Sequence, residues 1–373
     1  MNLEQLFCPN IDCPARGQAN QGNLVIHSQI EKRCLCSVCN KSFAITKGTL
    51  FYRLRTDPKV VMCVIVLLAY GCPTQAIVQA FGFDERTVKN WWERAGHQCE
   101  AVHEHLIGQS QLDLQQVQAD EIKAKILGGS LWLAMAIMVS TRLWLGGVAS
   151  PHRDLELIQS LADRIRAMAL CRPLLLAVDG LPGYPKAFQR AFRSKVPRSG
   201  KKGRPQLYSW PDIAIVQVIK RRLPAGLEIE RRIVQGGPLL VKRLRQMTQN
   251  EPGVINTAYI ERLNATFRMR LSWLTRRTRT LAQQPETLTA GLFIVGCFYN
   301  LCDPHHSLRL RLSVGRFGHR WVNRTPAMAA ALTDHIWTVD ELLKYRVPTP
   351  RWKPPKQRGR RSKELLQVIE RWC

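Results

Sequence analysis

Acidic residues are scarce in this chain relative to basic ones. Its 373 residues include 28 Asp and Glu against 55 Lys and Arg, so the formal net charge is +27. A positive field of this size concentrates phosphates and steers their approach, which predicts a polyanionic partner and favours nucleic acid over a membrane surface. Because 45% of the residues are hydrophobic, the chain cannot be wholly disordered, and its positive charge is expected on a folded surface.

Long hydrophobic runs are also missing. The longest apolar stretch, Val60–Tyr70, is well short of the ~20 residues that a membrane-spanning helix needs, and it indicates a buried helix instead. Met1–Phe7 leads directly into a cysteine motif and does not have the pattern of a secretory signal. Twelve cysteines without such a signal favour a reducing compartment, where thiols serve as metal ligands or buried groups. The sequence therefore predicts a cytoplasmic protein without a membrane partner.

Composition divides the chain into four segments. Residues 1–52 are rich in Cys, Gly and Asn, residues 53–108 carry helical patterns, residues 109–312 alternate strands with helices, and residues 313–373 form a C-terminal extension. The extension ends in a Pro/Lys/Arg-rich tail, Pro348–Cys373, which we expect to be only partly ordered.

The third segment has the periodicity of an α/β domain. Its hydrophobic pattern predicts one helix and four strands, namely a helix at 154–168 and strands at 116–123, 131–139, 143–148 and 174–178. Three strands before a helix and a further strand favour a mixed sheet with helices on both faces. Six basic residues and no acidic one lie between Arg193 and Arg204, which indicates a basic loop within an insertion.

Two short-spaced cysteine pairs, Cys8-x4-Cys13 and Cys36-x2-Cys39, lie in the first segment. Zn²⁺ prefers four tetrahedral ligands, and each pair supplies two thiolates from one tight turn. A module of this size cannot bury enough apolar surface to fold alone, which favours a structural zinc. Cys34 could replace Cys36 as a ligand, although Cys36 gives the tighter spacing.

The second segment has the pattern of a helix-turn-helix. Pro73–Phe81 reads as a first helix, Gly82-Phe83 as the turn, and Asp84 as the cap of a second helix, Glu85–Ala95. An ordinary helical hairpin is the alternative. The polar residues left on the outer face of the second helix are of the types that contact phosphates and base edges, and they are Arg86, Thr87, Lys89, Asn90 and Arg94.

Three carboxylates occur in three kinds of local sequence. Asp120 lies in a strand-like run, Asp179 ends an apolar run, and Glu261 opens a helical pattern. Strand, strand and helix in this order is typical of a ribonuclease H-like domain, whose acids hold two Mg²⁺ or Mn²⁺ ions about 4 Å apart for phosphoryl transfer. Asp120 and Glu121 point to opposite faces of one strand, so only one of them is expected to face the site.

The helix that begins near Glu261 has two distinct faces. Its apolar stripe packs against a sheet and consists of Ile260, Leu263, Phe267, Leu271 and Leu274. Glu261, Asn264 and Arg268 share another face at spacings of three and four residues. An acid for a metal ion would therefore point the same way as two candidate DNA contacts, Asn264 and Arg268.

The order of these motifs resembles that of bacterial DDE transposases of the insertion sequence one family. Three segments are similar to segments of that family, namely Ile260–Arg268, Tyr299–His305 and Arg320–Ala329. The resemblance covers most of residues 8–340. It implies that Asp120, Asp179 and Glu261 bind the catalytic metal ions and that Arg268 contacts the transposon end. Glu261 follows Asp179 by 82 positions, a long gap that indicates an insertion around residues 193–211.

The resemblance implies a transposase that binds the terminal inverted repeats of its own element, as a homo-oligomer on double-stranded DNA at the bacterial nucleoid. Water would release a 3′-OH at the element's end, and this hydroxyl would then attack target DNA. Two alternatives remain at this point. A structure-specific nuclease or resolvase would use the same acids and stop at hydrolysis, and a non-enzymatic regulator would use only the zinc ribbon and the helix-turn-helix.

Overall fold

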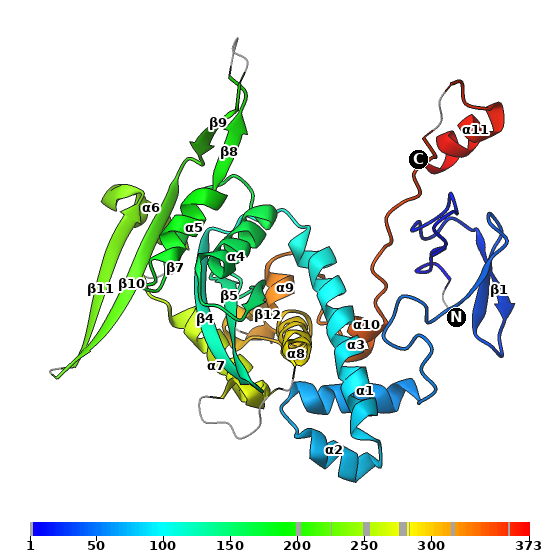
Figure 1. Cartoon of the computed structure of the whole chain (residues 1–373), viewed down its shortest axis with the longest axis horizontal. Coiled ribbons are helices and arrows are strands. Elements are labelled where there is room, and N and C mark those ends of the chain that lie inside the picture. Colours follow the sequence, from blue (N-terminus) through cyan, green and yellow to red (C-terminus); the bar gives the residue numbers. More distant parts are fainter. Residues whose placement is uncertain are drawn as a thin grey trace. The chain divides into compact units, whose positions relative to one another are not determined.

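The computed structural model describes residues 3–198, 203–224, 226–248, 254–275, 282, 284–314, 318–356 and 359–373. The chain separates into two compact units, one formed by Met1–Met62 with Leu343–Cys373 and the other by Cys63–Leu342. Helices α1 (Pro58–Ala69) and α10 (Val339–Lys344) span the boundaries in sequence between them (Figure 1). The division into four segments at residues 52, 108 and 312 stays a prediction.

The first unit contains a small antiparallel sheet in the order β1-β2-β3. Its strands are β1 (Leu24–Ser28), β2 (Arg33–Cys36) and β3 (Ser42–Ala44). The predicted tail contains helix α11 (Lys363–Trp372). Trp372 is buried and packs against the apolar cluster that includes Cys8, Cys13 and Cys36. The C-terminal segment thereby completes the core of the N-terminal one.

The apolar run predicted as a buried helix forms α1. Val61, Val64, Ile65 and Ala69 are fully buried. Helix α2 (Thr74–Phe81) follows and ends at Gly82, whose φ of 68° makes the left-handed C-cap. These bounds agree with the first predicted helix.

Helix α3 (Glu85–His103) begins as predicted, since the Asp84 side chain accepts a hydrogen bond from the amide of Arg86 at 2.8 Å. The predicted end at Ala95 is wrong, because the helix continues for two more turns. Gly96 does not end it: a Cβ at this position would lie 2.3 Å from the Cβ of Ala290 in helix α8 (Pro285–Cys297). Gly96 is thus a close contact between two packed helices rather than a helix stop.

A six-stranded mixed sheet forms the core of the second unit, in the order β11-β10-β7-β4-β5-β6. Strands β4, β5 and β6 run antiparallel in succession, β7 lies parallel to β4, β10 parallel to β7, and β11 antiparallel to β10. The strands are β4 (Gln116–Ile126), β5 (Gly129–Met138), β6 (Trp144–Ser150), β7 (Leu174–Val178), β10 (Ile213–Leu223) and β11 (Gly226–Gln235). The four predicted strands are confirmed, each within three residues at either end.

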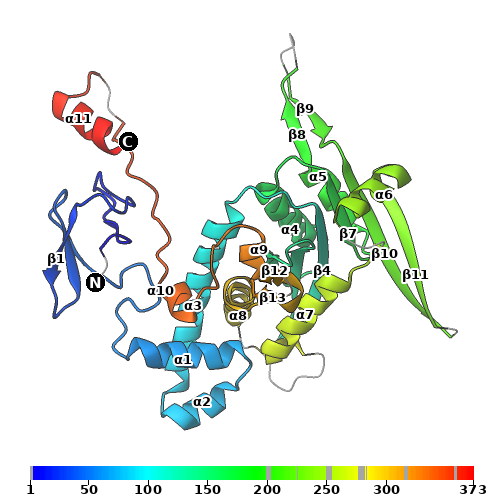
Figure 2. The ribbon, with the colours of Figure 1, turned by 180° about the vertical axis from the view of Figure 1, so that it is seen from behind.

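Helices cover both faces of this sheet, as the sequence predicts (Figure 1 and, from behind, Figure 2). Helices α4 (Leu155–Met168) and α5 (Gly183–Ala191) pack on one face, and α7 (Ala258–Arg270) and α8 on the other. Asp154 caps α4 through the amide of Leu157, which confirms the predicted helix start. Helix α6 (Gly237–Thr248) packs on β7 and β10.

Two further hairpins extend the second unit. Strand β8 (Arg193–Val196) pairs with β9 (Gln206–Ser209), so the prediction of a loop from Arg193 onward is wrong for its first four residues. Local composition indicated a loop, but the strand depends on a partner strand ten to sixteen residues away. Residues 199–202 of the predicted loop lie outside the described residues. The other hairpin pairs β12 (Leu310–Val314) with β13 (Gly318–Val322).

Candidate functional site

Two neighbouring acids on β4 are held by helices on opposite faces of the sheet. Asp120 Oδ2 accepts a hydrogen bond from Asn264 Nδ2 of α7 at 2.8 Å. Glu121 Oε2 accepts one from the Tyr184 hydroxyl of α5 at 2.7 Å, and both partners are buried. The alternation of a strand thus gives these carboxylates different surroundings.

Asp179 directly follows β7, next to the acids of β4. The parallel pairing of the two strands ends at Ala119↔Val178, so Asp120 and Asp179 are the next residues along each strand. Asp179 Oδ1 accepts a hydrogen bond from the Leu181 amide at 2.9 Å. Gly180 keeps the turn narrow, because a Cβ there would lie 3.2 Å from the Ile219 side chain.

Carboxylate oxygens of Asp120, Glu121 and Asp179 lie within 4.8 Å of one another, and this group could hold a metal ion. The expectation that only one of Asp120 and Glu121 reaches the site therefore needs correction. Since the pairing of β4 with β7 ends one residue earlier, side chains from both faces of β4 can approach Asp179 around the open end. Strand alternation predicts that Glu121 points away from Asp120 and therefore from the site, but its carboxylate belongs to the group of three acids.

Helix α7 is anchored to strand β4 by the side chain of Gln118. The side chain of Gln118 is fully buried, and its Oε1 accepts hydrogen bonds from the amides of Tyr259 and Ile260, both at 3.0 Å. Its Nε2 donates to the Asn256 carbonyl at 2.7 Å. The first turn of a helix has amides without an intrahelical partner, so Gln118 satisfies two of them. It thereby fixes the start of α7 relative to Asp120, two residues away on β4.

Glu261 lies in the first turn of α7, outside the group of three acids. Its Oε1 accepts a hydrogen bond from the Thr257 hydroxyl at 2.5 Å. The same oxygen forms an ion pair with the ammonium group of Lys220 on β10. Lys220 is a site residue that the sequence analysis missed.

A second cation lies beside the other acids. Arg153, between β6 and α4, donates from Nε to Glu121 Oε1 at 2.5 Å, and its Nη2 lies 3.5 Å from Asp179 Oδ2. Its guanidinium carbon is 5.0 Å from the centre of the Trp132 ring. Arg153 and Lys220 thus compensate charge on three acids.

The metal-binding and DNA-contacting residues that the sequence predicts within residues 109–312 all line one cavity of about 780 Å³. The predicted members are Asp120, Asp179, Glu261, Asn264 and Arg268, and they are joined by Arg153 and Lys220. Two strands and one helix that are distant in sequence therefore meet at one opening, as the conjunction of acids suggested.

Burial and charge shift the proton affinities of these acids in different directions. Burial raises the pKa of Asp120 to about 7, and the charge of Glu121 contributes to the rise. The pKa of Asp179 is also raised by burial and by Glu121. Burial acts in the same sense on Glu261, but hydrogen bonds from Lys220 and Thr257 outweigh it and lower the pKa. A cation bound between Asp120 and Asp179 would reverse the rise in both.

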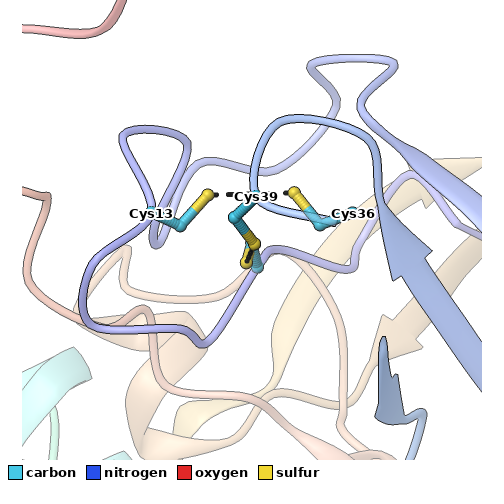
Figure 3. Close-up of side chains that lie close together, drawn as sticks. Cys13, Cys36 and Cys39 are labelled. Atoms are coloured by element: carbon cyan, nitrogen blue, oxygen red, sulfur yellow. Dashed lines mark hydrogen bonds between the residues drawn. The ribbon is translucent and has the colours of Figure 1, made fainter. Parts of the chain in front are cut away.

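The four predicted cysteine ligands converge in the first unit. The sulfur atoms of Cys8, Cys13, Cys36 and Cys39 lie within 4.8 Å of one another and could hold a metal ion. Cys8 Sγ is 3.7 Å from Cys39 Sγ, and Cys13 Sγ is 3.8 Å from Cys36 Sγ. Figure 3 shows the side chains of Cys13, Cys36 and Cys39 pointing toward one another.

Cys34 lies outside this group, in a separate apolar cluster with Leu6 and Phe43. The group contains Cys36, and the Asn23 amide donates to its sulfur at 3.2 Å. Asn40, after the second pair, has a φ of 50°, the left-handed conformation that closes the turn between the cysteines and β3.

The candidate DNA-contacting residues of α3 differ in exposure and in their contacts. Arg86 and Asn90 are exposed, while Thr87 and Arg94 are half-buried. Lys89 instead reaches Gln284, whose Oε1 accepts its hydrogen bond at 2.9 Å, and forms an ion pair with Glu93.

Comparison with protein-family models finds none that matches the chain, and comparison with curated proteins likewise finds no match. Within the described part of the chain, every helix is too short or too polar to cross a membrane.

Proposed function

We propose that the chain is a DDE-type DNA transposase with a ribonuclease H-like catalytic domain. The observation that carries the proposal is that Asp120, Asp179 and Glu261, from two adjacent parallel strands and a helix, line one cavity in a chain of net charge +27. The strand order supports the fold assignment: an antiparallel succession β4-β5-β6 is extended beyond β4 by the parallel strands β7 and β10.

The acids fit a pair of hard divalent ions, Mg²⁺ or Mn²⁺, whose preferred ligands are oxygens. Besides the carboxylates, Asn264 contributes an amide oxygen, Oδ1, that is buried and has no hydrogen-bond partner among the described residues. When bound, the two ions would activate the attacking oxygen and stabilise the leaving one. The resemblance of these motifs to those of DDE transposases indicates that Asp120, Asp179 and Glu261 are the ligands of the metal ions.

The chain's own residues prepare this site. Asn264 orients Asp120 through their hydrogen bond, and Gln118 sets the position of Glu261. Arg268 lies on the cavity wall, seven residues after Glu261, where its guanidinium supplies a contact for a DNA phosphate. Arg153 and Lys220 offset part of the negative charge of Asp179 and Glu261.

The cysteine group fits a structural zinc. Four sulfurs at about 2.3 Å from Zn²⁺ in a tetrahedron are about 3.8 Å apart, close to the 3.7 and 3.8 Å of the two contacts. Burial raises the pKa of Cys8 to about 12, so a metal ion is needed to keep this thiol deprotonated. We propose that this zinc ribbon and the α2–α3 helix-turn-helix bind the element's ends.

The test uses the full chain with DNA that flanks its own gene, a supercoiled target, and Mg²⁺ or Mn²⁺. Asp120→Asn, Asp179→Asn and Glu261→Gln are each expected to abolish end cleavage and strand transfer while DNA binding persists, because each change removes a charge from the metal site. The effects should be far from additive, since the acids act as one unit.

Glu156→Gln is the matched control, because Glu156 is an exposed acid on α4 and its amide should retain full activity. Cleavage without strand transfer by the unaltered chain would assign it to the nucleases or resolvases. Full activity of any one of the three amide variants would contradict the assignment of that acid. Specific end binding by a chain that cleaves no DNA would favour a regulator.

A further inference from the structure

The β12–β13 hairpin is an exposed ribbon on a fixed base. All residues of β12 are exposed, as are the first four of β13. At the base, Arg324 Nε donates to the Leu308 carbonyl at 2.8 Å, and the His305 amide donates to the Arg324 carbonyl at 2.9 Å. Leu308 and Thr325 are buried on either side of the ribbon. The strands are therefore presented to solvent from a rigid support.

The strand register separates the side chains into two faces. Arg311 is paired with Trp321, and Ser313 with His319, so these four lie on one face. Residues at the alternate positions, such as Leu312 and Arg320, lie on the other. The first face, termed the planar face, contains the flat side chains of Arg309, Arg311, His319 and Trp321.

The planar face is an ordered row of flat groups. The guanidinium carbon of Arg309 lies 5.0 Å from the centre of the Trp321 ring, and the His319 ring meets that ring edge-on at 6.0 Å. Arg311 Nη2 is 3.5 Å from His319 Nδ1. Trp321 is nevertheless 47% exposed, although burial of an indole is strongly favourable. The ring is thus held in place by its neighbours while it remains accessible.

Charge selects the kind of partner. The sequence between Asp303 and Asp334 contains five Arg and no Asp or Glu. A ribbon of this composition attracts a polyanion. An exposed aromatic ring on the same face as guanidinium groups can bind nucleic acid by stacking on bases and by contacts to phosphates. Because the base faces of a duplex are already stacked on one another, insertion of the ring there would cost unstacking energy. An unpaired base is therefore the favoured partner of the ring.

We propose that the planar face binds single-stranded nucleic acid, with Trp321 stacked on an unpaired base and Arg309 and Arg311 in contact with the flanking phosphates. The proposal deepens the proposed function and rests on it for the identity of the nucleic acid as DNA. The ribbon would then hold a separated strand of that DNA.

The experiment measures binding of the full chain in buffer without Mg²⁺ or Mn²⁺ and without a chelator, so that no catalysis occurs while the cysteine group keeps its zinc. The probes are a labelled duplex, the same duplex with a splayed single-stranded end, and the single strand alone. Trp321→Ala is expected to weaken binding of the two unpaired probes by about 5- to 150-fold and to leave the duplex unchanged. Trp321→Phe should retain most of the affinity, because a phenyl ring still stacks.

Two pairs of variants provide matched controls. Arg311→Ala and Arg320→Ala remove the same charge from opposite faces of the ribbon, and only Arg311→Ala should weaken the unpaired probes by more than it weakens the duplex. Leu312→Ala removes a side chain about as exposed as Trp321, 48% against 47%, and should have no effect. Unchanged thermal unfolding of Trp321→Ala would confirm that the hairpin change leaves the fold intact.

Several results would overturn the proposal. An equal loss on duplex and unpaired probes would show that the ribbon reads duplex DNA, and an equal loss with Arg311→Ala and Arg320→Ala would reduce its role to general attraction. A change in self-association with Leu312→Ala, and none in binding with Trp321→Ala, would assign the hairpin to a contact between copies. The binding assay does not depend on catalysis. If the unaltered chain bound the unpaired probes but carried out no strand transfer, this result would contradict the proposed function and not the role of the planar face.

Discussion

Single residues that are close in sequence and alike in type have different roles in this chain. Cys34 and Cys36 both belong to β2 and are both fully buried, yet only Cys36 is part of the sulfur group. Spacing favoured Cys36 but left Cys34 open, because either residue could begin a short turn toward Cys39. The packing of Cys34 against Leu6 and Phe43 distinguishes them, and such packing has no signature in the local sequence.

We therefore predict opposite outcomes for these two cysteines. Cys36→Ser should reduce bound zinc from about one per chain to nearly none and unfold the first unit, because a structural zinc site contributes directly to folding. Cys34→Ala should keep the zinc and cost only about 1 kcal/mol of stability, since it deletes one buried sulfur from an apolar cluster. Elemental analysis of the two purified variants is the measurement, and zinc loss from Cys34→Ala would reverse the assignment.

At the scale of elements, local sequence patterns predicted those helices and strands that do not depend on contacts with distant parts of the chain. Strand β7 was predicted with its observed bounds, because Leu174–Val178 is an unbroken apolar run that is buried on both faces. The link between β4 and α7 could not be predicted in this way. Gln118 meets Tyr259 and Ile260 across more than 140 residues. The alternation of a strand shows only that Gln118 shares a face with Asp120.

Gln118 is predicted to be a positioning residue for the helix that carries Glu261. Gln118→Met keeps the volume but leaves two helix amides and one carbonyl without this partner, so we expect a loss of about 1–3 kcal/mol in the free energy of unfolding. End cleavage should fall as well, and the Mg²⁺ concentration needed for half-maximal cleavage should rise. Denaturant unfolding and a Mg²⁺ titration of cleavage measure these effects.

Asn300 provides the control for a purely structural loss. Its buried amide makes two hydrogen bonds to the backbone of Trp144, at 2.9 and 2.8 Å, so Asn300→Leu should cost a similar stability. Neither residue lines the acidic cavity. If the two variants are equally stable and show the same Mg²⁺ requirement, then Gln118 supports the fold without positioning the site.

For the whole molecule, net charge predicted the kind of partner but not how the charge is arranged. The +27 charge indicated a polyanion, and within the described residues Arg153 and Lys220 contact Glu121, Asp179 and Glu261 of the site. Neither cation could be identified from the sequence, because each lies in a segment without a motif and acquires its role only through the sheet. The same holds for the tail, whose composition indicated only partial order.

The tail is part of the first compact unit, which contains both Met1–Met62 and Leu343–Cys373. Trp372 is buried against the cysteine cluster, and the Trp372 carbonyl accepts a hydrogen bond from Gln18 at 2.9 Å. Trp372→Ala should therefore destabilise the zinc module by about 3 kcal/mol and speed the loss of zinc to a chelator. Leu366→Ala, at an exposed position of the same helix, should release zinc at the original rate. Equal rates for both variants and the unaltered chain would show that α11 contributes nothing to the stability of the cysteine site, and would leave the first 62 residues to fold around the metal unaided.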